Sequence, residues 1–418
     1  MSSILNDVVI IGAGLSGAVL ALALNENSIP CRIYEARYER DRALGSGVSI
    51  APNGCRVLDR LGILERIAPK SYQTEYQVIK DAAGRSIRRV NIANPDIYGY
   101  KTYRLYRHVL LDELRKVLNE RKIHVEYGAK FERIVEETAY GVTFLVNGEI
   151  KRASLLIGAD GIHSAVRRYI SPQPPEYTGI ACVYGHLPAG SIQWPTREFE
   201  KACTIQDDPG VLFMGPEVAD GSELLVGRQF AYPTLDRTGW EALETDKSRL
   251  CSLFCKDYEG FQQLAKSIMD QISARKEGLL LWPYYRMPKL EHWSSILGHI
   301  TIIGDAAHAI PPSSGQGVNQ AFEDAHTLAL LLGSLSRKTE LKEALDFWYH
   351  LRQTRIDAVV RKAQETDILR LPRTERLLLK QRPESESSQE SQSTDHGMKW
   401  LYMPTTDDEI TAWIRVPS

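Results

Sequence analysis

Three glycines near the start of the chain have the spacing of a phosphate-binding turn. Gly12, Gly14 and Gly17 follow the apolar run VVII and precede a second apolar run, which predicts a buried strand, a tight turn and a helix. Gly14 lets the main chain approach a pyrophosphate without a Cβ in the way, and Gly17 lets the helix pack closely on the strand. The helix start at Leu15 and Ser16 favours negative charge because its N–H groups are free. This pattern predicts a nucleotide diphosphate as the ligand.

A carboxylate stands where the ribose of such a nucleotide needs an acceptor. Residues 31–34 read as a second strand that ends in Glu35 and Ala36, and Glu35 lies 18 positions after Gly17. A carboxylate at this place accepts hydrogen bonds from the ribose hydroxyls of an adenosine. Strand, turn, helix and acid together indicate a Rossmann-type dinucleotide site. Close packing of a helix on a strand, with no ligand, is the alternative.

Two later segments also place an acid after a buried strand. Residues 155–157 precede Asp160 and Gly161, and residues 299–303 precede Asp305. A strand-end aspartate often caps the following helix, which is the alternative interpretation of Asp160. The segment after Asp305 continues through a Pro-Pro bend and two glycines into a helix, a pattern that a simple strand-to-helix turn does not require.

The three motifs, in this order and spacing, closely resemble those of the class A flavoprotein monooxygenases, whose fold is that of para-hydroxybenzoate hydroxylase. The resemblance covers roughly residues 6–370. It implies FAD as the cofactor, with Asp305 accepting hydrogen bonds from the ribityl hydroxyls and Asp160 contacting FAD. Gly315 and Gly317 then bring a helix start to the isoalloxazine, where the helix dipole stabilises the reduced, anionic ring.

The same resemblance places further positions at the cofactor. Arg107 matches an arginine that contacts FAD in relatives, and the loop Gly45–Gly47 matches a flexible glycine loop beside the flavin, with a plain surface loop as the alternative. The residues expected at FAD are Gly12, Gly14, Leu15, Ser16, Gly17, Glu35, Ala36, Gly47, Arg107, Asp160, Gly161, Asp305, Pro312, Gly315, Gly317 and Val318.

The resemblance also implies a reaction. In such enzymes NAD(P)H reduces the flavin, O2 adds at the flavin C(4a) carbon, and the hydroperoxide transfers one oxygen atom to the substrate. We therefore predict a single-component FAD-dependent monooxygenase of specialised metabolism, with NADPH favoured, that hydroxylates or epoxidises a hydrophobic small molecule such as an aromatic or polycyclic compound. A flavin-dependent reductase or dehydrogenase of the same fold is one alternative. A nicotinamide-dependent dehydrogenase is another, but it leaves residues 304–317 unexplained.

No residue is assigned as a catalytic acid or base. Arg228 or His186 could bind or deprotonate a phenol, although a strand residue that faces solvent is at least as good an interpretation of either. The candidates for the substrate pocket are Tyr184, His186, Arg228, Tyr232, Tyr284 and Tyr285. The six cysteines show no C-x-x-C pair and no accompanying histidine cluster, so we expect free thiols and no metal site.

The fold class expected is α/β, with a Rossmann-like FAD-binding domain and a second, sheet-based substrate domain. The boundaries predicted are 1–70, 101–175 and 290–335 for the FAD-binding domain, 71–100 and 176–289 for the substrate domain, and 336–418 for a C-terminal helical segment. Helices are expected over 53–67, 240–255 and 260–274, with a long amphipathic helix from 341. The polar segment at about 383–396 reads as a mobile loop.

Charge and hydropathy exclude several classes of function. The chain has 51 Lys and Arg against 53 Asp and Glu, which gives no support for a nucleic-acid or anionic-membrane partner. The apolar run over 8–24 follows an aspartate, contains three turn glycines and is short for a bilayer span. We expect a cytoplasmic monomer or homodimer whose partners are a small-molecule substrate and O2.

The placement of Asp305 gives a first prediction. Asp305→Ala should remove or weaken bound FAD, because the ribityl hydroxyls lose their carboxylate acceptor. The flavin absorbance of the purified variant, compared with that of the unchanged protein, measures this loss. Unchanged FAD occupancy would argue against this placement of the ribityl chain.

Overall fold

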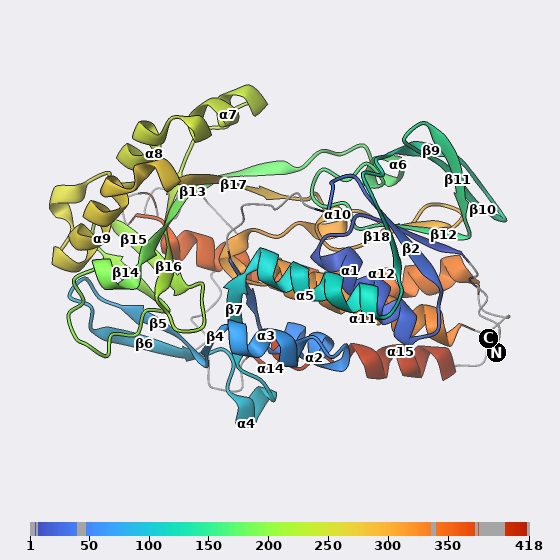
Figure 1. The fold of residues 1–418 in the computed structure, drawn as a ribbon, viewed down its shortest axis with the longest axis horizontal. Coiled ribbons are helices and arrows are strands. Elements are labelled where there is room, and N and C mark those ends of the chain that lie inside the picture. The colour runs from blue at the N-terminus through green and yellow to red at the C-terminus, as the bar shows by residue number, and fades with distance from the viewer. Residues whose placement is uncertain are drawn as a thin grey trace, which may run out of the picture.

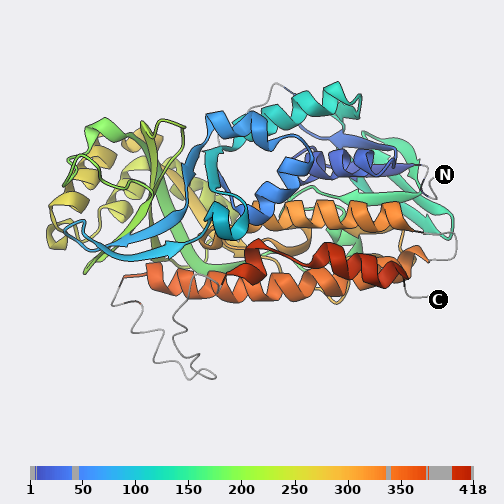
Figure 2. The same cartoon turned by 90° about the horizontal axis from the view of Figure 1, so that it is seen from below.

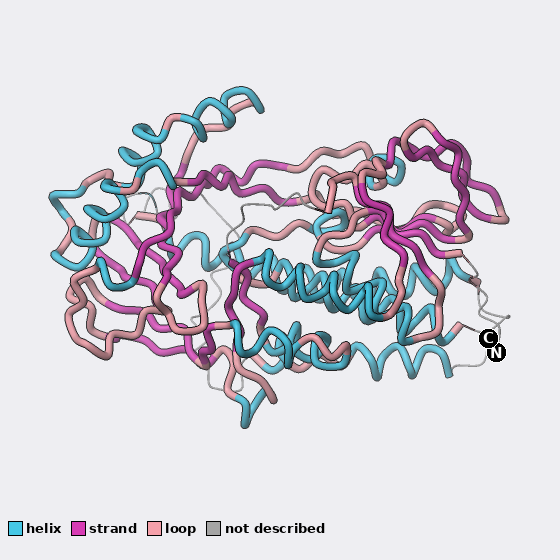
Figure 3. Tube along the Cα trace, viewed as in Figure 1, coloured by secondary structure: helices cyan, strands magenta, loops and turns pink. Residues whose placement is uncertain are grey.

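The computed structural model describes residues 5, 7–39, 47–335, 340–372, 375 and 398–415. The molecule is elongated, with one sheet region near each end and long helices between them (Figure 1; Figure 3). The predicted mobile loop over 383–396, and Gly45 and Ser46 of the predicted flavin loop, lie outside the described residues.

A parallel sheet of five strands forms the nucleotide-binding end. Its strands, in spatial order, are β18 (Ile300–Ile302), β12 (Leu155–Gly158), β1 (Val8–Ile11), β2 (Cys31–Glu35) and β8 (His124–Tyr127). All residues of β1 and β12 are buried, as expected for parallel strands covered on both faces. The predicted Rossmann-like fold is confirmed.

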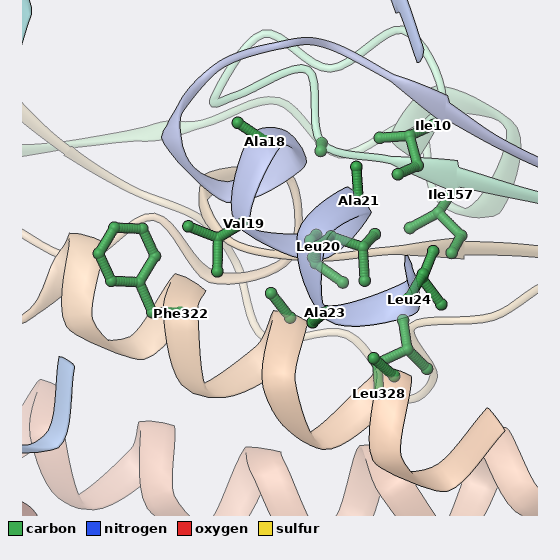
Figure 4. Packing of buried hydrophobic residues seen from close by; sticks show 14 of the residues in the cluster. Ile10, Ala18, Val19, Leu20, Ala21, Ala23, Leu24, Ile157, Phe322 and Leu328 are labelled. Carbon is green, nitrogen blue, oxygen red and sulfur yellow. The ribbon is translucent and has the colours of Figure 1, made fainter. Parts of the chain in front are cut away.

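Helix α1 (Leu15–Glu26) packs between this sheet and helix α11 (Gly317–Ser334). Figure 4 shows Val19 of α1 beside Phe322 of α11, and Leu24 of α1 between Ile157 of the sheet and Leu328 of α11. The close approach explains Gly17, because a Cβ there would lie 1.9 Å from the carbonyl oxygen of Gly12. Gly17 is thus a packing position of the turn.

A seven-stranded sheet forms the other end. Its strands, in spatial order, are β17 (Leu280–Arg286), β13 (Glu176–Pro188), β16 (Glu223–Ala231), β15 (Gly210–Pro216), β14 (Cys203–Asp207), β5 (Tyr76–Lys80) and β6 (Ser86–Asn91). Neighbours are antiparallel except β14 and β5. Helices α7 (Arg237–Thr245), α8 (Lys247–Phe254) and α9 (Gln263–Ala274) pack on one face. The other face carries Cys182, Tyr184, Leu225 and Tyr284.

Two smaller sheets and several further helices complete the fold. The sheet β3 (Gly47–Ile50), β7 (Thr102–Tyr106) and β4 (Tyr72–Thr74) is antiparallel, as is the sheet β9 (Phe131–Thr138), β10 (Gly141–Val146) and β11 (Glu149–Ala153). The remaining helices are α2 (Pro52–Arg60), α3 (Leu64–Ile67), α4 (Pro95–Tyr98), α5 (Arg107–Glu120), α6 (Arg167–Ile170), α10 (Asp305–His308), α14 (Lys399–Tyr402) and α15 (Thr406–Arg415). The domain boundaries given above stay a prediction.

Two helices expected as single runs are broken. The run over 53–67 divides into α2 and α3 at Gly62, whose φ of +72° ends the first helix. The run over 240–255 divides at Asp246, whose carboxylate accepts a hydrogen bond from the Arg249 N–H and so caps α8. In both cases a local turn residue interrupts an apolar pattern that continues through it.

Helix α12 (Leu341–Arg370) links the two ends of the molecule. Its 30 residues span about 45 Å, and it runs along one side from the nucleotide-binding part to the seven-stranded sheet (Figure 2). No helix within the described ranges has an apolar stretch that would cross a lipid bilayer.

A fully buried ionic cluster joins α12 to α11. The Arg352 guanidinium donates to Asp324 Oδ1 at 2.8 Å and to Glu323 Oε2 at 2.6 Å. Asp324 Oδ2 also accepts from the Gly304 N–H at 2.9 Å and lies 2.5 Å from His308 Nε2. Burial alone would raise the pKa of Asp324, but His308 and Arg352 lower it to about 2. Asp324 is therefore a carboxylate that holds both ends of the short α10 segment.

Removing the cation of this cluster should destabilise the fold. Arg352→Met removes the cation that pairs with both Glu323 and Asp324, and we expect the free energy of unfolding to fall by about 3 kcal/mol or more in urea titrations. Arg361→Met is the matched control, because Arg361 is exposed on the same helix. It should change stability by less than about 0.5 kcal/mol. Equal stability of the two variants would contradict this role.

Candidate active site

A cavity of about 660 Å³ extends from the glycine turn to the seven-stranded sheet. It brings together predicted positions that are up to 306 residues apart in sequence, from Gly12 to Val318. The predicted FAD residues that line it are Gly12, Gly14, Leu15, Ser16, Glu35, Ala36, Gly47, Arg107, Asp160, Gly161, Asp305, Pro312, Gly315, Gly317 and Val318. Gly17 lies outside this lining, since it packs against the strand. The individual contacts to FAD stay predictions.

The glycine turn is held by backbone geometry and by Glu35. Gly12 has a φ of +104°, and its N–H donates to the Tyr34 carbonyl at 2.8 Å. Glu35 Oε2 accepts from the Ala13 N–H at 2.7 Å, and Oε1 accepts from the Arg37 N–H at 2.9 Å. The side of Gly14 is open: no atom of the described residues lies within 4 Å of the place where a Cβ would stand. This open cradle at the start of α1 fits a diphosphate.

Asp160 lines the cavity, and its two carboxylate oxygens have different surroundings. Its Oδ2 accepts from the N–H groups of Ala165 at 2.7 Å and Val166 at 3.3 Å, which is the capping role considered above. Its Oδ1 is buried, and among the described residues it has no hydrogen-bond partner. Burial raises the pKa of Asp160, although the hydrogen bonds oppose this shift. A bound group with a hydroxyl or N–H would satisfy the remaining oxygen.

The third motif forms the wall between the nucleotide end and the seven-stranded sheet. Asp305 begins α10 directly after β18, and Gly315 takes a φ of +62° just before α11 begins at Gly317. Asn319 fixes this loop, because its Nδ2 donates to the carbonyls of Gly315 at 2.8 Å and Ser49 at 3.1 Å. The free N–H groups at the start of α11 favour negative charge there.

A sequence profile describing an FAD-binding domain matches residues 6–247 and 290–363 of the chain. The chain belongs to this FAD-binding family. The match covers all three motifs, and it confirms FAD as the predicted cofactor. The open cradle at Gly14 and the Asp160 oxygen that has no partner among the described residues fit that group.

Relatives of this FAD-binding protein carry the names of monooxygenases. A 3-amino-4-hydroxybenzoate 2-monooxygenase from Streptomyces cremeus is 28% identical over 362 residues, which cover 85% of this chain and 86% of the relative. A 6-methylsalicylate 1-monooxygenase from Aspergillus terreus is 26% identical over 386 residues, covering 87% and 82%. These relatives confirm the resemblance to the flavoprotein monooxygenases and the predicted enzyme class, an FAD-dependent monooxygenase.

Solved structures show the same fold. HpxO from Klebsiella pneumoniae, solved with FAD and uric acid, superimposes with a TM-score of 0.74 at 20% identity, covering 90% of this chain and 91% of that one. This likeness confirms the fold class, with its Rossmann-like FAD-binding part and separate sheet.

A second cavity of about 250 Å³ adjoins the first. It lies between the seven-stranded sheet, the small β3–β7–β4 sheet and the loop Pro312–Gln316. The residues common to both linings are Ser49, Arg104, Phe213, Leu225, Pro312, Gly315 and Arg370. The second cavity therefore adjoins the larger one along the loop Pro312–Gln316.

The sequence-predicted pocket candidates separate into two groups. Tyr184 and Tyr284 line the larger cavity. Tyr232 and Tyr285 lie outside both linings and belong to an aromatic cluster with Tyr177. His186 also lies outside, with its ring centroid 5.6 Å from that of Tyr106, and burial lowers its pKa.

Arg228 requires a correction as a pocket candidate. Alternation along β16 turns it toward the helices, where only 2% of the residue is exposed. Its guanidinium donates to the carbonyls of Phe254 at 2.8 Å, Lys256 at 2.6 Å and Pro209 at 3.2 Å. Arg228 thus satisfies backbone carbonyls at the end of α8, on the face of the sheet away from the cavities.

Sequence reasoning missed Arg104, Phe213, Leu225 and Arg370, which line both cavities. Arg104 and Thr102 alternate on β7 and face the second cavity, so strand periodicity carried a signal for them. Arg370 is the last residue of α12, and nothing in its sequence context shows which sheet the helix end meets.

Because the side of Gly14 is open, a substitution there should change FAD binding without weakening the fold. Gly14→Ala should leave the stability of the FAD-free protein unchanged or raise it by about 0.4–1 kcal/mol, because its φ of −70° suits alanine. The same methyl group projects into the cradle, so the Kd for FAD should rise at least about tenfold, or about 1.4 kcal/mol.

Gly17→Ala is the matched control, because its Cβ would meet the Gly12 carbonyl oxygen. It should lower the free energy of unfolding by about 1–3 kcal/mol. Fluorescence titration with FAD and urea denaturation measure the two effects. FAD affinity unaffected by Gly14→Ala would contradict the cradle.

Proposed function

We propose that the protein uses NAD(P)H, FAD and O2 to hydroxylate a phenolic aromatic molecule held in the second cavity. The supporting observation is that the two cavities share seven lining residues, among them Pro312 and Gly315, so a ligand of the smaller cavity would lie beside the position expected for the flavin ring. The names of the relatives from Streptomyces cremeus and Aspergillus terreus both specify hydroxylated aromatic acids.

The dimensions and lining of the second cavity suit one aromatic ring. Phe213, Met214 and Leu225 of the sheet supply apolar surface, and Tyr72 and Thr102 supply hydroxyl groups. The Thr102 hydroxyl is buried and, in the part of the chain described, has no hydrogen-bond partner. Such a group is free to bond a hydroxyl substituent of the ring.

The chain's residues would position the reactants. FAD, when bound, supplies the redox chemistry that activates O2 for transfer of one oxygen atom. The N–H groups at the start of α11 would stabilise negative charge on the reduced ring. The apolar wall of Phe213 and Leu225 would exclude water from the reacting faces.

Oxygen transfer is tested directly by mass and by reductant consumption. FAD-loaded protein should oxidise NADPH or NADH faster with 3-amino-4-hydroxybenzoate or 6-methylsalicylate than without. The product should carry one oxygen atom from O2, so it should be about 2 mass units heavier with ¹⁸O2 than with ¹⁶O2, whether or not hydroxylation replaces the carboxylate as CO2. Asp305→Ala, depleted of FAD, is the negative control.

Two results would oppose the proposal. NADPH oxidation that yields only hydrogen peroxide in every case argues against oxygen transfer to these compounds. Oxidation or reduction of the aromatic compound without oxygen gain would favour the reductase or dehydrogenase alternative.

A further inference from the structure

Two arginines stand where the cavities meet. Arg104 comes from β7 and Arg370 from the end of α12, and both line the two cavities. Within the part of the chain described, they are the only basic residues of the smaller cavity. Each is therefore a candidate to receive an anionic group of the substrate.

Arg104 already forms an ion pair within the protein. Its guanidinium donates to Glu217 Oε1 at 2.5 Å and to Ser49 Oγ at 3.2 Å, and the Glu217 side chain is fully buried. A second carboxylate at Arg104 would lie close to that of Glu217 and would be repelled by it. The Arg104 charge is thus used to compensate Glu217.

The surroundings of Arg370 differ from those of Arg104. Its guanidinium stacks over the ring of Phe213, with 4.9 Å between the guanidinium carbon and the ring centroid. Among the described residues, no carboxylate forms an ion pair with it. The nearby Asp367 carboxyl lies 3.4 Å from the Gln229 amide, and burial raises its pKa, although Arg370 opposes that shift. A half-buried guanidinium so placed gains most from an anion that fills the cavity.

We propose that Arg370 binds the carboxylate of the substrate, so that the enzyme selects aromatic carboxylic acids over the corresponding neutral phenols. This inference rests on the proposed function. The planar fork of arginine suits bidentate contact with a carboxylate, while stacking on Phe213 orders the side chain before the ligand enters. The ring would then lie along Phe213 and Leu225, with its hydroxyl directed toward the polar face of β7.

Two pairs of probes that differ only by a carboxylate test this role. They are 3-amino-4-hydroxybenzoate with 2-aminophenol, and 6-methylsalicylate with 3-methylphenol. Dissociation constants come from the change in flavin absorbance when each probe is added to FAD-loaded protein without NADPH. The variants are Arg370→Gln and Arg370→Lys, with Arg361→Gln as a control that removes the same charge from the exposed part of α12.

We expect the unchanged protein to bind the acid of at least one pair about tenfold more tightly than the neutral probe. Arg370→Gln should raise the dissociation constant of that acid about tenfold or more. It should change the dissociation constant of the neutral probe less than twofold. Arg370→Lys keeps the charge but lacks the planar guanidinium, so its affinity for the acid should lie between those of the unchanged protein and Arg370→Gln. Arg361→Gln should match the unchanged protein, and thermal denaturation confirms that all variants fold.

Two outcomes would overturn the inference. One is equal affinity of the unchanged protein for acid and neutral probe, or failure to bind either acid. The other is an equal loss of affinity for the acid and for the neutral probe in Arg370→Gln, which would show that Arg370 contacts the ring or its hydroxyl. Oxygen transfer is measured separately: Arg370-dependent binding of the acid without oxygenation would contradict the proposed function and leave the anion site in place.

Discussion

The arrangement of the site depends on one buried carboxylate, Asp324. It receives hydrogen bonds from Arg352 of α12 and from the Gly304 N–H, and it contacts His308 at the end of α10. These contacts tie together the end of β18, the segment that begins at Asp305 and the helix that reaches the second sheet. A buried charge without these partners would be strongly destabilising, so the cluster tolerates little displacement of any of its members.

The seven-stranded sheet separates structural from ligand-facing roles by the alternation of its strands. Along β16, Val226, Arg228 and Phe230 turn toward α7–α9, whereas Leu225 faces the cavities. Arg228 therefore bonds backbone carbonyls, and the cation proposed to meet the substrate comes from α12 on the opposite face. The two arginines thus have different roles because they lie on opposite sides of one sheet.

Local motifs were predicted well because their residues interact over short stretches of chain. The strand, turn and helix around Gly12–Gly17 and the segment from Asp305 to Gly317 are defined by backbone conformation, which glycine spacing and apolar runs reveal. The breaks at Gly62 and Asp246 were missed, because the apolar pattern continues across each turn residue. Tyr184 and Tyr284 were expected at the pocket and line the larger cavity, whereas Arg228 was not placed correctly.

By itself, the sequence determined the nucleotide-binding turn, the family, FAD as the cofactor and the α/β class of the fold. Each of these depends on residue types at fixed spacing, where local sterics leave few conformations open. The tertiary structure alone decided which side chains line the two cavities. Arg104 contacts Glu217, which is 113 residues away in sequence, and Arg370 reaches Phe213 because α12 runs from the nucleotide-binding part to the seven-stranded sheet. Such contacts follow from how helices and sheets pack, which spacing along the chain does not encode.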